Sequence, residues 1–471
     1  MINKRILEII LSEQVQELAV KAQMALCKRK EEDLVNLNSN MAQVVIGVRR
    51  SGKSTLCFNV LRHAGVKYAY VNFDDERLEG LSAKDLNTVL EVLYKINGDF
   101  SHLFLDEIQN VNGWHLFVNR MLRQGMKILI TGASGFVGSF LVEHGLEHGH
   151  EVWAALRATS SRRYLTDPRI RFIELNLGDD AELRRQLSAH GAEHGAFDCV
   201  IHAAGATKAA NLEAFRRTNT AGTLRLARTL LELNLLRGRF VFVSSLSVMG
   251  PAADPDSAAA AAAPYRPISD NDRPVPNTDY GRSKLEAEEA LAGVEGLDYV
   301  ILRPTGVYGP RERDYFLMAD SIRKHIDFAV GYRPQRLTFI YVRDLVDACY
   351  AALTRGERGR AYFLSDGGSY DSREFGRLLQ SEMGVHGVLR ITAPEWFLHG
   401  VCALGSLSYK LFGRKGTMPP TLNLDKFRLL RQRNWLCDIE PARRDLGFAP
   451  QWTLAAGVKE AVAWYKSEGW L

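Results

Sequence analysis

The sequence has few cysteines, and no two of them lie close together. The six cysteines are spread over 471 residues, so neither a disulfide-rich secreted fold nor a C-x-x-C metal or redox motif is indicated. No secretory signal is recognisable at the N-terminus. We therefore expect reduced, buried thiols in a cytoplasmic protein.

Long apolar runs and blocks of like charge are scarce as well. The most apolar stretch, from Trp396 to Phe412, is interrupted by His399, Lys410 and several glycines and serines, which argues against a membrane span. We expect a core or substrate-pocket helix here, with a segment lying on a membrane surface as the alternative. The formal net charge is only +5, with Lys and Arg spread along the chain, which argues against nucleic acid as the main partner.

The pattern of apolar segments predicts two α/β units. In the first, apolar runs at Val44–Ile46, Tyr68–Phe73 and Leu103–Leu105 are separated by helical patterns, which predicts a short parallel sheet. A longer alternation begins at Met126 and predicts a doubly wound parallel sheet of the Rossmann type. We therefore divide the chain into a partial P-loop module, residues 1–125, and a larger domain, residues 126–471.

The larger domain changes character along its length. Regular alternation predicts a dinucleotide-binding core over residues 126–310. From about Arg311, helices and short strands are mixed, and we assign residues 311–471 mainly to a smaller substrate lobe with returning core elements. The segment Pro251–Pro264, rich in Ala and Pro, is predicted to be a loop.

The first of two glycine-rich loops has the spacing Gly-x-x-x-x-Gly-Lys-Ser. The backbone of such a loop surrounds phosphates, Lys53 reaches the terminal ones and Ser54 ligates magnesium. An apolar strand ending in Asp106 and Glu107 supplies partners for the metal's water shell and for an attacking water. A surface glycine turn with coincidental acids is the alternative. The candidate ATP and magnesium site comprises Gly47, Gly52, Lys53, Ser54, Thr55, Asp106 and Glu107.

This loop, together with the segments Tyr70–Asp75 and Leu105–Asn110, resembles the AAA+-like P-loop ATPases over residues 30–125. In such ATPases the next strand ends in a polar sensor residue. Residues Ile128–Ser134 supply that strand, but they also open the second glycine-rich loop. The sensor helix, arginine finger and C-terminal domain do not follow. The resemblance therefore implies a truncated module that binds a nucleotide without hydrolysing it.

The second glycine-rich loop has the spacing Gly-x-x-Gly-x-x-Gly between a strand and a helix. It lets the backbone approach a dinucleotide pyrophosphate at the N-terminus of the helix. Its candidate cofactor contacts are Gly132, Ser134, Gly135, Phe136, Val137 and Gly138.

Three downstream residues are candidates for catalysis. Tyr280 and Lys284 are one helical turn apart, so the ammonium is expected to lower the pKa of the phenol and make Tyr280 a general acid and base. Ser245, which follows an apolar strand, is expected to hydrogen-bond the substrate oxygen. An ordinary helix pair is the alternative for Tyr280 and Lys284, but the glycine loop and Ser245 argue against it.

Further motifs accompany these residues: His202–Gly205, Asn219-x-x-Gly222-Thr223, Ser244-Ser245, Leu302–Pro304, Tyr308–Pro310 and Tyr341–Asp344. With them, residues 126–471 resemble the extended short-chain dehydrogenase/reductases of the epimerase/dehydratase superfamily. The resemblance implies that Lys284 holds the nicotinamide ribose and that the backbone near Pro304 meets the carboxamide. It also implies cofactor contacts from Ala203, Ala204 and Asn219, and a homodimer formed through the Tyr280 helix.

The identity of the cofactor depends on the end of the second strand of this domain. Arg157 stands there, with Arg162 and Arg163 close behind, and a cation at this place suits a 2′-phosphate. Asn176 and Leu177 stand where the family often has an Asp beside the adenine. We favour NADP over NAD, with a solvated basic surface as the alternative for the arginines.

The sequence indicates the class of substrate mainly at positions where it lacks residues that bind the substrate in relatives. Gly306 and Leu337 replace an Asn and an Arg that bind sugar-nucleotide phosphates in relatives, although Arg333 and Arg336 lie close enough in sequence to compensate. An apolar pocket lined by residues such as Trp396, Phe397 and Leu398 is predicted, with core packing as the alternative for these side chains.

We predict an NAD(P)-dependent oxidoreductase that interconverts a secondary alcohol and a ketone, with a small hydroxysteroid-like or other apolar substrate. A nucleotide-sugar epimerase or dehydratase is the alternative. An ATP-binding regulatory module fused to a dehydrogenase is a hypothesis of another class. The cluster His144, His148 and His150 is predicted to lie on the surface and not to bind a metal.

Overall fold

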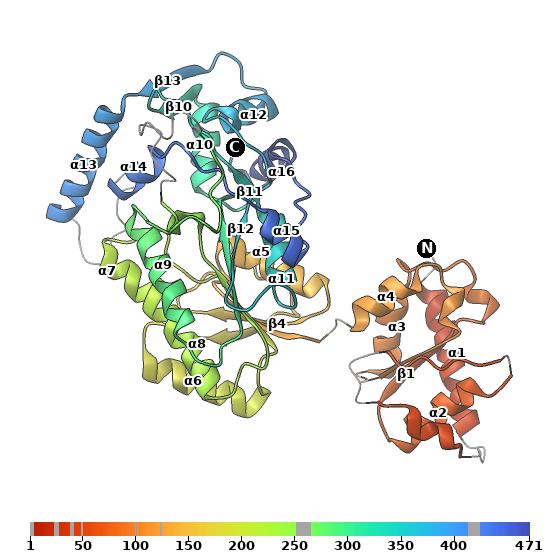
Figure 1. The fold of residues 1–471 in the computed structure, drawn as a ribbon. Coiled ribbons are helices and arrows are strands. Elements are labelled where there is room, and N and C mark those ends of the chain that lie inside the picture. Colours follow the sequence, from red (N-terminus) through yellow and green to blue (C-terminus); the bar gives the residue numbers. More distant parts are fainter. Residues whose placement is uncertain are drawn as a thin grey trace. The chain divides into compact units, whose positions relative to one another are not determined.

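The computed structural model describes residues 4–22, 28–37, 42–48, 50–98, 100, 102–122, 125–250, 265–412 and 424–471. The chain divides into two compact units, Met1–Gly125 and Met126–Leu471, called unit 1 and unit 2 (Figure 1). The predicted loop 251–264 lies outside the described residues.

Unit 1 is a small parallel α/β structure. Its strands β1 (Tyr68–Asn72) and β2 (His102–Asp106) pair in parallel, as predicted. Apolar residues of α3 recur at helical spacing and are buried, which packs this helix onto the sheet. The helices are α1 (Lys4–Ala22), α2 (Lys53–His63), α3 (Leu86–Asn97) and α4 (Trp114–Leu122).

The strand predicted at Val44–Ile46 is not formed. Residues 42–47 have no strand structure, and the side chains of Val44 and Ile46 are 70% and 87% exposed. Apolar residues form a stable strand only where a neighbouring strand pairs with them and a second layer covers them. The segment lines a cavity opposite β2 and does not pair with it.

Unit 2 is built on a seven-stranded sheet with the order β12-β8-β7-β6-β3-β4-β5, in which every pairing is parallel. The predicted doubly wound sheet is thus confirmed. The strands are β3 (Lys127–Thr131), β4 (Glu151–Leu156), β5 (Arg171–Glu174), β6 (Cys199–His202), β7 (Phe240–Val243), β8 (Tyr299–Pro304) and β12 (Ala361–Leu364).

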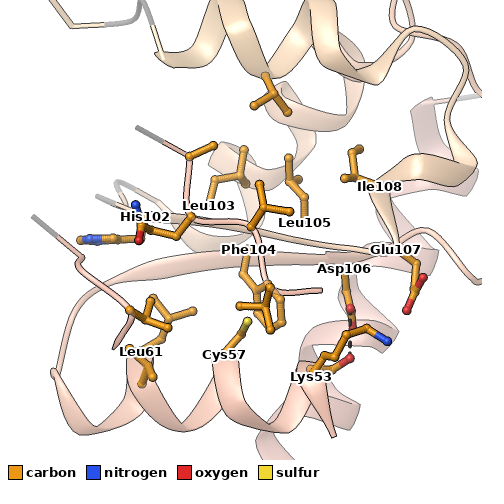
Figure 2. Close-up of a pocket in the computed structure, with 18 of the residues that line it drawn as sticks. Lys53, Cys57, Leu61, His102, Leu103, Phe104, Leu105, Asp106, Glu107 and Ile108 are labelled. Atoms are coloured by element: carbon orange, nitrogen blue, oxygen red, sulfur yellow. Dashed lines mark hydrogen bonds between the residues drawn. The ribbon is translucent and has the colours of Figure 1, made fainter. Parts of the chain in front are cut away.

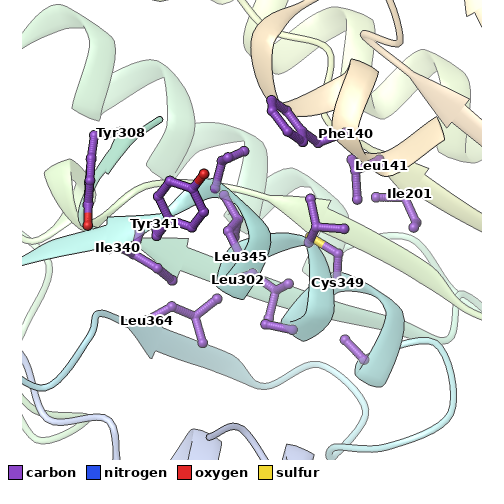
Figure 3. Close-up of a cluster of buried hydrophobic side chains, with 14 of the residues drawn as sticks. Phe140, Leu141, Ile201, Leu302, Tyr308, Ile340, Tyr341, Leu345, Cys349 and Leu364 are labelled. Carbon is purple, nitrogen blue, oxygen red and sulfur yellow. The ribbon is translucent and has the colours of Figure 1, made fainter. Parts of the chain in front are cut away.

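Helices cover both faces of this sheet, which explains why its central strands are apolar on both sides. All five residues of β3 are buried. One face packs on α5 (Phe136–Glu147), α11 (Val342–Ala351), α15 (Glu440–Leu446) and α16 (Leu454–Ser467), and part of this core is shown in Figure 3. The other packs on α6 (Asp180–His194), α8 (Gly222–Glu232) and α9 (Asp279–Ala292).

The later part of unit 2 adds two short parallel pairs. These are β9 (Gly306–Tyr308) with β11 (Phe339–Tyr341), and β10 (Ile326–Val330) with β13 (Leu389–Ala393). Its remaining helices are α7 (Leu212–Phe215), α10 (Asp314–Arg323), α12 (Glu374–Met383), α13 (Glu395–Phe412) and α14 (Leu424–Leu430).

The helix predicted from Trp396 to Phe412 is present as α13, but it is not a core helix. Trp396 and Phe397 are 76% and 52% exposed, and of the three residues predicted to line an apolar pocket only Leu398 is buried. Hydropathy alone does not tell which element covers an apolar face. No helix in the described part of the chain has the length and apolar character needed to span a membrane.

Candidate active site

The glycine-rich loop after β3 is shaped by close backbone contacts. Gly132 has φ +71°, and a Cβ on it would lie 2.8 Å from the carbonyl of Ala203 and the nitrogen of Ala204. A Cβ on Gly138 would lie 2.0 Å from the carbonyl oxygen of Gly132. Only glycine fits both positions. The loop is thus packed against the residues that follow β6, and the N-terminus of α5 begins directly after it at Phe136.

Asn219 connects this region to the helix that carries Tyr280. It is fully buried in a π-helical segment, Arg216–Ala221, a rare geometry that is frequent at functional sites. Its Nδ2 donates to the Ser283 hydroxyl of α9 at 2.9 Å and to the Ala206 carbonyl at 3.0 Å, while its Oδ1 accepts from the Ala206 N–H at 2.7 Å. The predicted cofactor contact Asn219 therefore fixes the chain after β6 to α9.

Ser245, Tyr280 and Lys284 come together at the carboxyl end of β7. The Ser245 hydroxyl lies close enough to the phenol of Tyr280 to lower its pKa, and it donates to the Ser247 hydroxyl at 3.1 Å. Lys284 is only 4% exposed, and its Nζ donates to the Val243 carbonyl at 2.8 Å and lies 4.6 Å from the ring centroid of Phe242.

The titration of these groups departs from the prediction. Burial raises the pKa of Tyr280 above its ordinary value, and the Ser245 hydroxyl lowers it only in part. The pKa of Lys284 is lowered to about 8 by burial, with the Glu288 carboxylate acting in the opposite direction. The expectation of a lowered pKa for Tyr280 is therefore not met in this arrangement: desolvation is the largest influence, and Lys284 is not among the groups that shift this pKa.

The other residues predicted to contact the cofactor lie at the ends of strands or just after them. Arg157 follows β4 and is exposed, whereas Arg162 lies over the Phe172 ring at 4.2 Å and Arg163 pairs with Glu468 at 3.0 Å. Three further positions are Asn176, whose Oδ1 accepts from the Gly178 N–H, Leu177, whose carbonyl accepts from Arg225, and Pro304, which ends β8.

Two carboxylates near the site were missed by the sequence analysis. Glu288, one turn beyond Lys284 on α9, accepts from Arg303 Nη2 at 2.6 Å and from the Ser244 hydroxyl at 2.5 Å. Its spacing from Lys284 is the signal that was available in the sequence. Asp425 of α14 accepts from the Asp279 N–H at 2.8 Å. This contact joins distant parts of the chain, and nothing in the local sequence indicates it.

The histidine cluster also differs from the prediction. His148 is exposed, but His144 and His150 are largely buried, and burial lowers their pKa values to about 3 and about 4. The rings of His144 and His148 stack at 3.9 Å, and His144 and His150 both pack on Tyr350.

Unit 1 contains a second candidate site. A cavity of about 1020 Å³ lies between residues 42–47 and β2, and Figure 2 shows Lys53, Asp106 and Glu107 at one end of it. The Ser54 hydroxyl donates to Asp106 Oδ1 at 3.0 Å, and Lys53 Nζ donates to the Gly47 carbonyl at 3.2 Å. Gly52 takes φ +82° at the start of α2, whereas Thr55 is exposed and does not line the cavity.

Models of two protein families match the chain. The NAD dependent epimerase/dehydratase family matches residues 128–364, and an AAA domain matches residues 39–146. Both resemblances stated from the sequence are thus confirmed. The two matches overlap from residue 128 to residue 146, which is β3 and most of α5. Because β3 pairs with β4 and β6 in unit 2, this strand is not part of the sheet of unit 1.

Individual proteins resemble unit 2 at low identity. The chain is 28% identical over 348 residues to UDP-glucose 4-epimerase from Vibrio cholerae, covering 71% of this chain and 93% of that protein. It is 26% identical over 365 residues to 3 beta-hydroxysteroid dehydrogenase/Delta 5→4-isomerase from Mycobacterium tuberculosis, covering 72% and 90%.

A solved structure has the same fold. It is the crystal structure of UDP-glucose 4-epimerase with UDP-glucose from Thermotoga maritima, with a TM-score of 0.57 and 22% identity. The match covers 72% of this chain and 99% of that one. At this identity the likeness concerns the fold alone.

Proposed function

The chain belongs to the NAD dependent epimerase/dehydratase family, and we propose that unit 2 is an oxidoreductase that interconverts a secondary alcohol and a ketone. The observation that carries the proposal is the convergence of Ser245, Tyr280 and Lys284 at the carboxyl end of β7. Residues 126–310 form the cofactor-binding core and residues 311–471 mainly the substrate lobe. The enzyme acts as a cytoplasmic homodimer.

The roles of the three residues follow from their contacts. Ser245 positions the substrate oxygen, and Tyr280 transfers the proton at that oxygen. Since burial raises the pKa of Tyr280, the phenol is protonated at neutral pH and is suited to donate its proton during ketone reduction. Lys284, held below the β7 end, binds the ribose hydroxyls. The nicotinamide cofactor, when bound, supplies or accepts the hydride.

NADP is the proposed cofactor, with NAD as the alternative. Arg157 supports NADP, because it is exposed at the end of β4, where a guanidinium binds a 2′-phosphate. Arg162 and Arg163 support it less, because they contact Phe172 and Glu468.

An apolar alcohol, such as a hydroxysteroid, is the proposed substrate. A Cβ on Gly306 would lie 2.3 Å from the Tyr315 hydroxyl, so the asparagine that binds sugar-nucleotide phosphates in relatives does not fit there without a shift of Tyr315. A relative from Mycobacterium tuberculosis is named a hydroxysteroid dehydrogenase. A nucleotide-sugar epimerase is the alternative, supported by the named relative from Vibrio cholerae.

The Tyr280→Phe variant tests the catalytic role. We expect its turnover with a 3-hydroxysteroid and NADP or NAD to fall by about 100-fold or more, because the proton donor is removed. Cofactor affinity, measured by nicotinamide fluorescence, should stay within a few-fold of the wild type. A variant with near-normal turnover would refute the role of Tyr280. Turnover of UDP-glucose, without turnover of steroids, would favour the epimerase.

For unit 1 we propose nucleotide binding without hydrolysis. Binding is supported by the hydrogen bond from Ser54 to Asp106, beside Lys53 at the cavity wall. The lack of hydrolysis is supported by the matched AAA domain, which extends into β3, a strand of unit 2. Calorimetry should detect Mg-ATP binding to the full chain and its loss in Lys53→Ala. Steady ATP turnover that disappears in Lys53→Ala would contradict the truncated module. A change in oxidoreductase activity in that variant would support a regulatory role for unit 1.

A further inference from the structure

Helix α13 has an apolar face that the described residues of unit 2 leave exposed. Trp396, Phe397, Val401 and Leu404 are exposed large apolar residues, and Leu404 is 68% exposed. Phe397, Val401 and Leu404 have the i, i+4, i+7 spacing of one helix face, and Trp396 lies beside them. The opposite side is buried, where Leu398 and Cys402 pack with Phe427 of α14. The helix therefore carries apolar residues on its exposed side as well as on its buried side.

The neighbouring β10–β13 pair continues this apolar surface. Ile326 pairs with Leu389 and Phe328 with Ile391, and all four side chains are exposed. They share one face because successive side chains of a strand alternate. Exposed Tyr332 follows β10, and Gly331 next to it donates to the Ala393 carbonyl just before α13. We call these residues, with the exposed apolar residues of α13, the outer patch; Figure 1 shows its elements along one edge of unit 2.

The segment that contains α13 is strongly basic. Residues 385–433 carry eight Lys and Arg against two Asp and Glu, a net charge of +6 in a chain whose total is +5. Among the described side chains, Arg390, Arg428 and Arg431 are about half exposed. These three arginines lie on β13 and in or just after α14, next to the elements of the outer patch, and each is 3.8–4.0 Å from a carboxylate.

The buried side of α13 leads to the catalytic helix. Leu424 and Phe427 of α14 pack against α13, and Asp425 between them accepts hydrogen bonds from the N–H groups of Asp279 and Tyr280 at 2.8 and 3.5 Å. Only one short helix therefore separates the outer patch from the first turn of α9, which carries Tyr280. A ligand that moves α13 acts close to the catalytic residue.

We propose that the outer patch docks unit 2 onto an anionic lipid bilayer, from which the enzyme takes a lipid alcohol as its substrate. Exposed Trp and Phe on one helix face, flanked by basic residues, suit the interface between headgroups and acyl chains. A second copy of the chain fits less well, because two identical basic segments would repel each other. The identity of the substrate rests on the proposed oxidoreductase function, whereas the docking does not.

Vesicle cosedimentation of the full chain tests the docking. Vesicles of phosphatidylcholine alone are compared with vesicles that contain phosphatidylglycerol in equal parts. We expect the wild type to bind the anionic vesicles more strongly, with binding weakened by added salt. The triple variant Trp396→Ser, Phe397→Ser and Leu404→Ser should bind about tenfold more weakly or worse. Its folding is preserved because all three side chains are exposed.

A matched control removes exposed apolar residues elsewhere. Leu34→Ser with Leu116→Ser changes two exposed leucines of unit 1 and should leave vesicle binding unchanged. A wild type that binds neither kind of vesicle overturns the proposal, as does a triple variant that binds as well as the wild type. If the triple variant instead dissociates a wild-type oligomer that does not bind vesicles, the patch contacts a second copy and the proposal fails.

A pair of substrates separates the docking from the chemistry. The triple variant should oxidise a short soluble secondary alcohol at the wild-type rate but a sterol held in anionic vesicles about tenfold more slowly, in parallel with its weaker binding. Equal rates of the two proteins on the vesicle-held sterol would refute the lipid substrate. If the wild type oxidises neither alcohol, the proposed function fails, while cosedimentation still decides the docking.

Discussion

At the scale of single residues, Glu288 helps to keep Lys284 charged. It is buried beside Arg303, and its carboxylate raises the pKa of Lys284 against the effect of burial. The lysine keeps its charge below pH about 8 and loses it above. We expect kcat/KM to fall at alkaline pH as Lys284 loses its charge. In Glu288→Gln this loss should occur at lower pH, so the fall of kcat/KM should move to lower pH as well. The pH profile of kcat/KM measures the shift.

The control for this prediction is Glu289→Gln, because Glu289 is the exposed neighbour on the same helix. It should leave the profile unchanged. Glu288→Gln should also lower the free energy of unfolding, since it leaves the Arg303 guanidinium without its full partner. Lower stability with an unchanged pH profile would mean that Glu288 has a structural role only.

At the scale of elements, the turn between β3 and α5 depends on the absence of a side chain at Gly138. In Gly138→Ala the new Cβ would meet the Gly132 carbonyl oxygen at 2.0 Å, which forces the strand and the helix apart. We expect a lower melting temperature and at least about tenfold weaker cofactor binding, because the loop that approaches the pyrophosphate is displaced. Gly293→Ala, at the end of α9 with its nearest contact at 3.6 Å, is the control. Unaltered cofactor affinity in Gly138→Ala would argue against this loop as the binding site.

A helix or strand was predictable from the sequence where its apolar pattern matches the burial that neighbouring elements give it in the fold. The strand β3 is apolar on both sides and is buried on both, and the Tyr280 helix carries its motif on one turn. The segment Val44–Ile46 has an equally apolar pattern but forms no strand, whereas β3, which the matched AAA domain also includes, pairs in unit 2. Helix α13 was predicted from its apolar stretch, yet its exposed face depends on which elements pack against it. Contacts between residues distant in sequence, such as the hydrogen bond to Asp425, likewise depend on how the elements pack against each other.

At the scale of the whole molecule, buried histidines make unit 2 sensitive to acid. Burial lowers the pKa values of four of them to about 3 or about 4: His144, His150, His190 and His202. The unfolded chain binds these protons first, near pH 6.5, so the stability present above that pH is lost as the pH falls. Asp344 acts in the opposite direction, since burial raises its pKa to about 6, and burial also raises the pKa values of Asp347, Asp366 and Asp425.

The variant His190→Phe isolates one of these contributions. The His190 ring stacks on Phe197 at 4.5 Å, and its Nε2 has no hydrogen-bond partner among the described residues, so a phenyl ring fits the site without losing a hydrogen bond. Between pH 6.5 and about 4, one such histidine makes the free energy of unfolding fall by about 1.4 kcal/mol per pH unit as the pH is lowered. Urea denaturation over this range should therefore show a slope smaller by that amount in His190→Phe, and the wild-type slope in the control His386→Asn, whose side chain is exposed. If the slope of His190→Phe equals that of the wild type, protonation of His190 does not contribute to the unfolding of unit 2 in acid. Protonation of the other three histidines would then have to account for it.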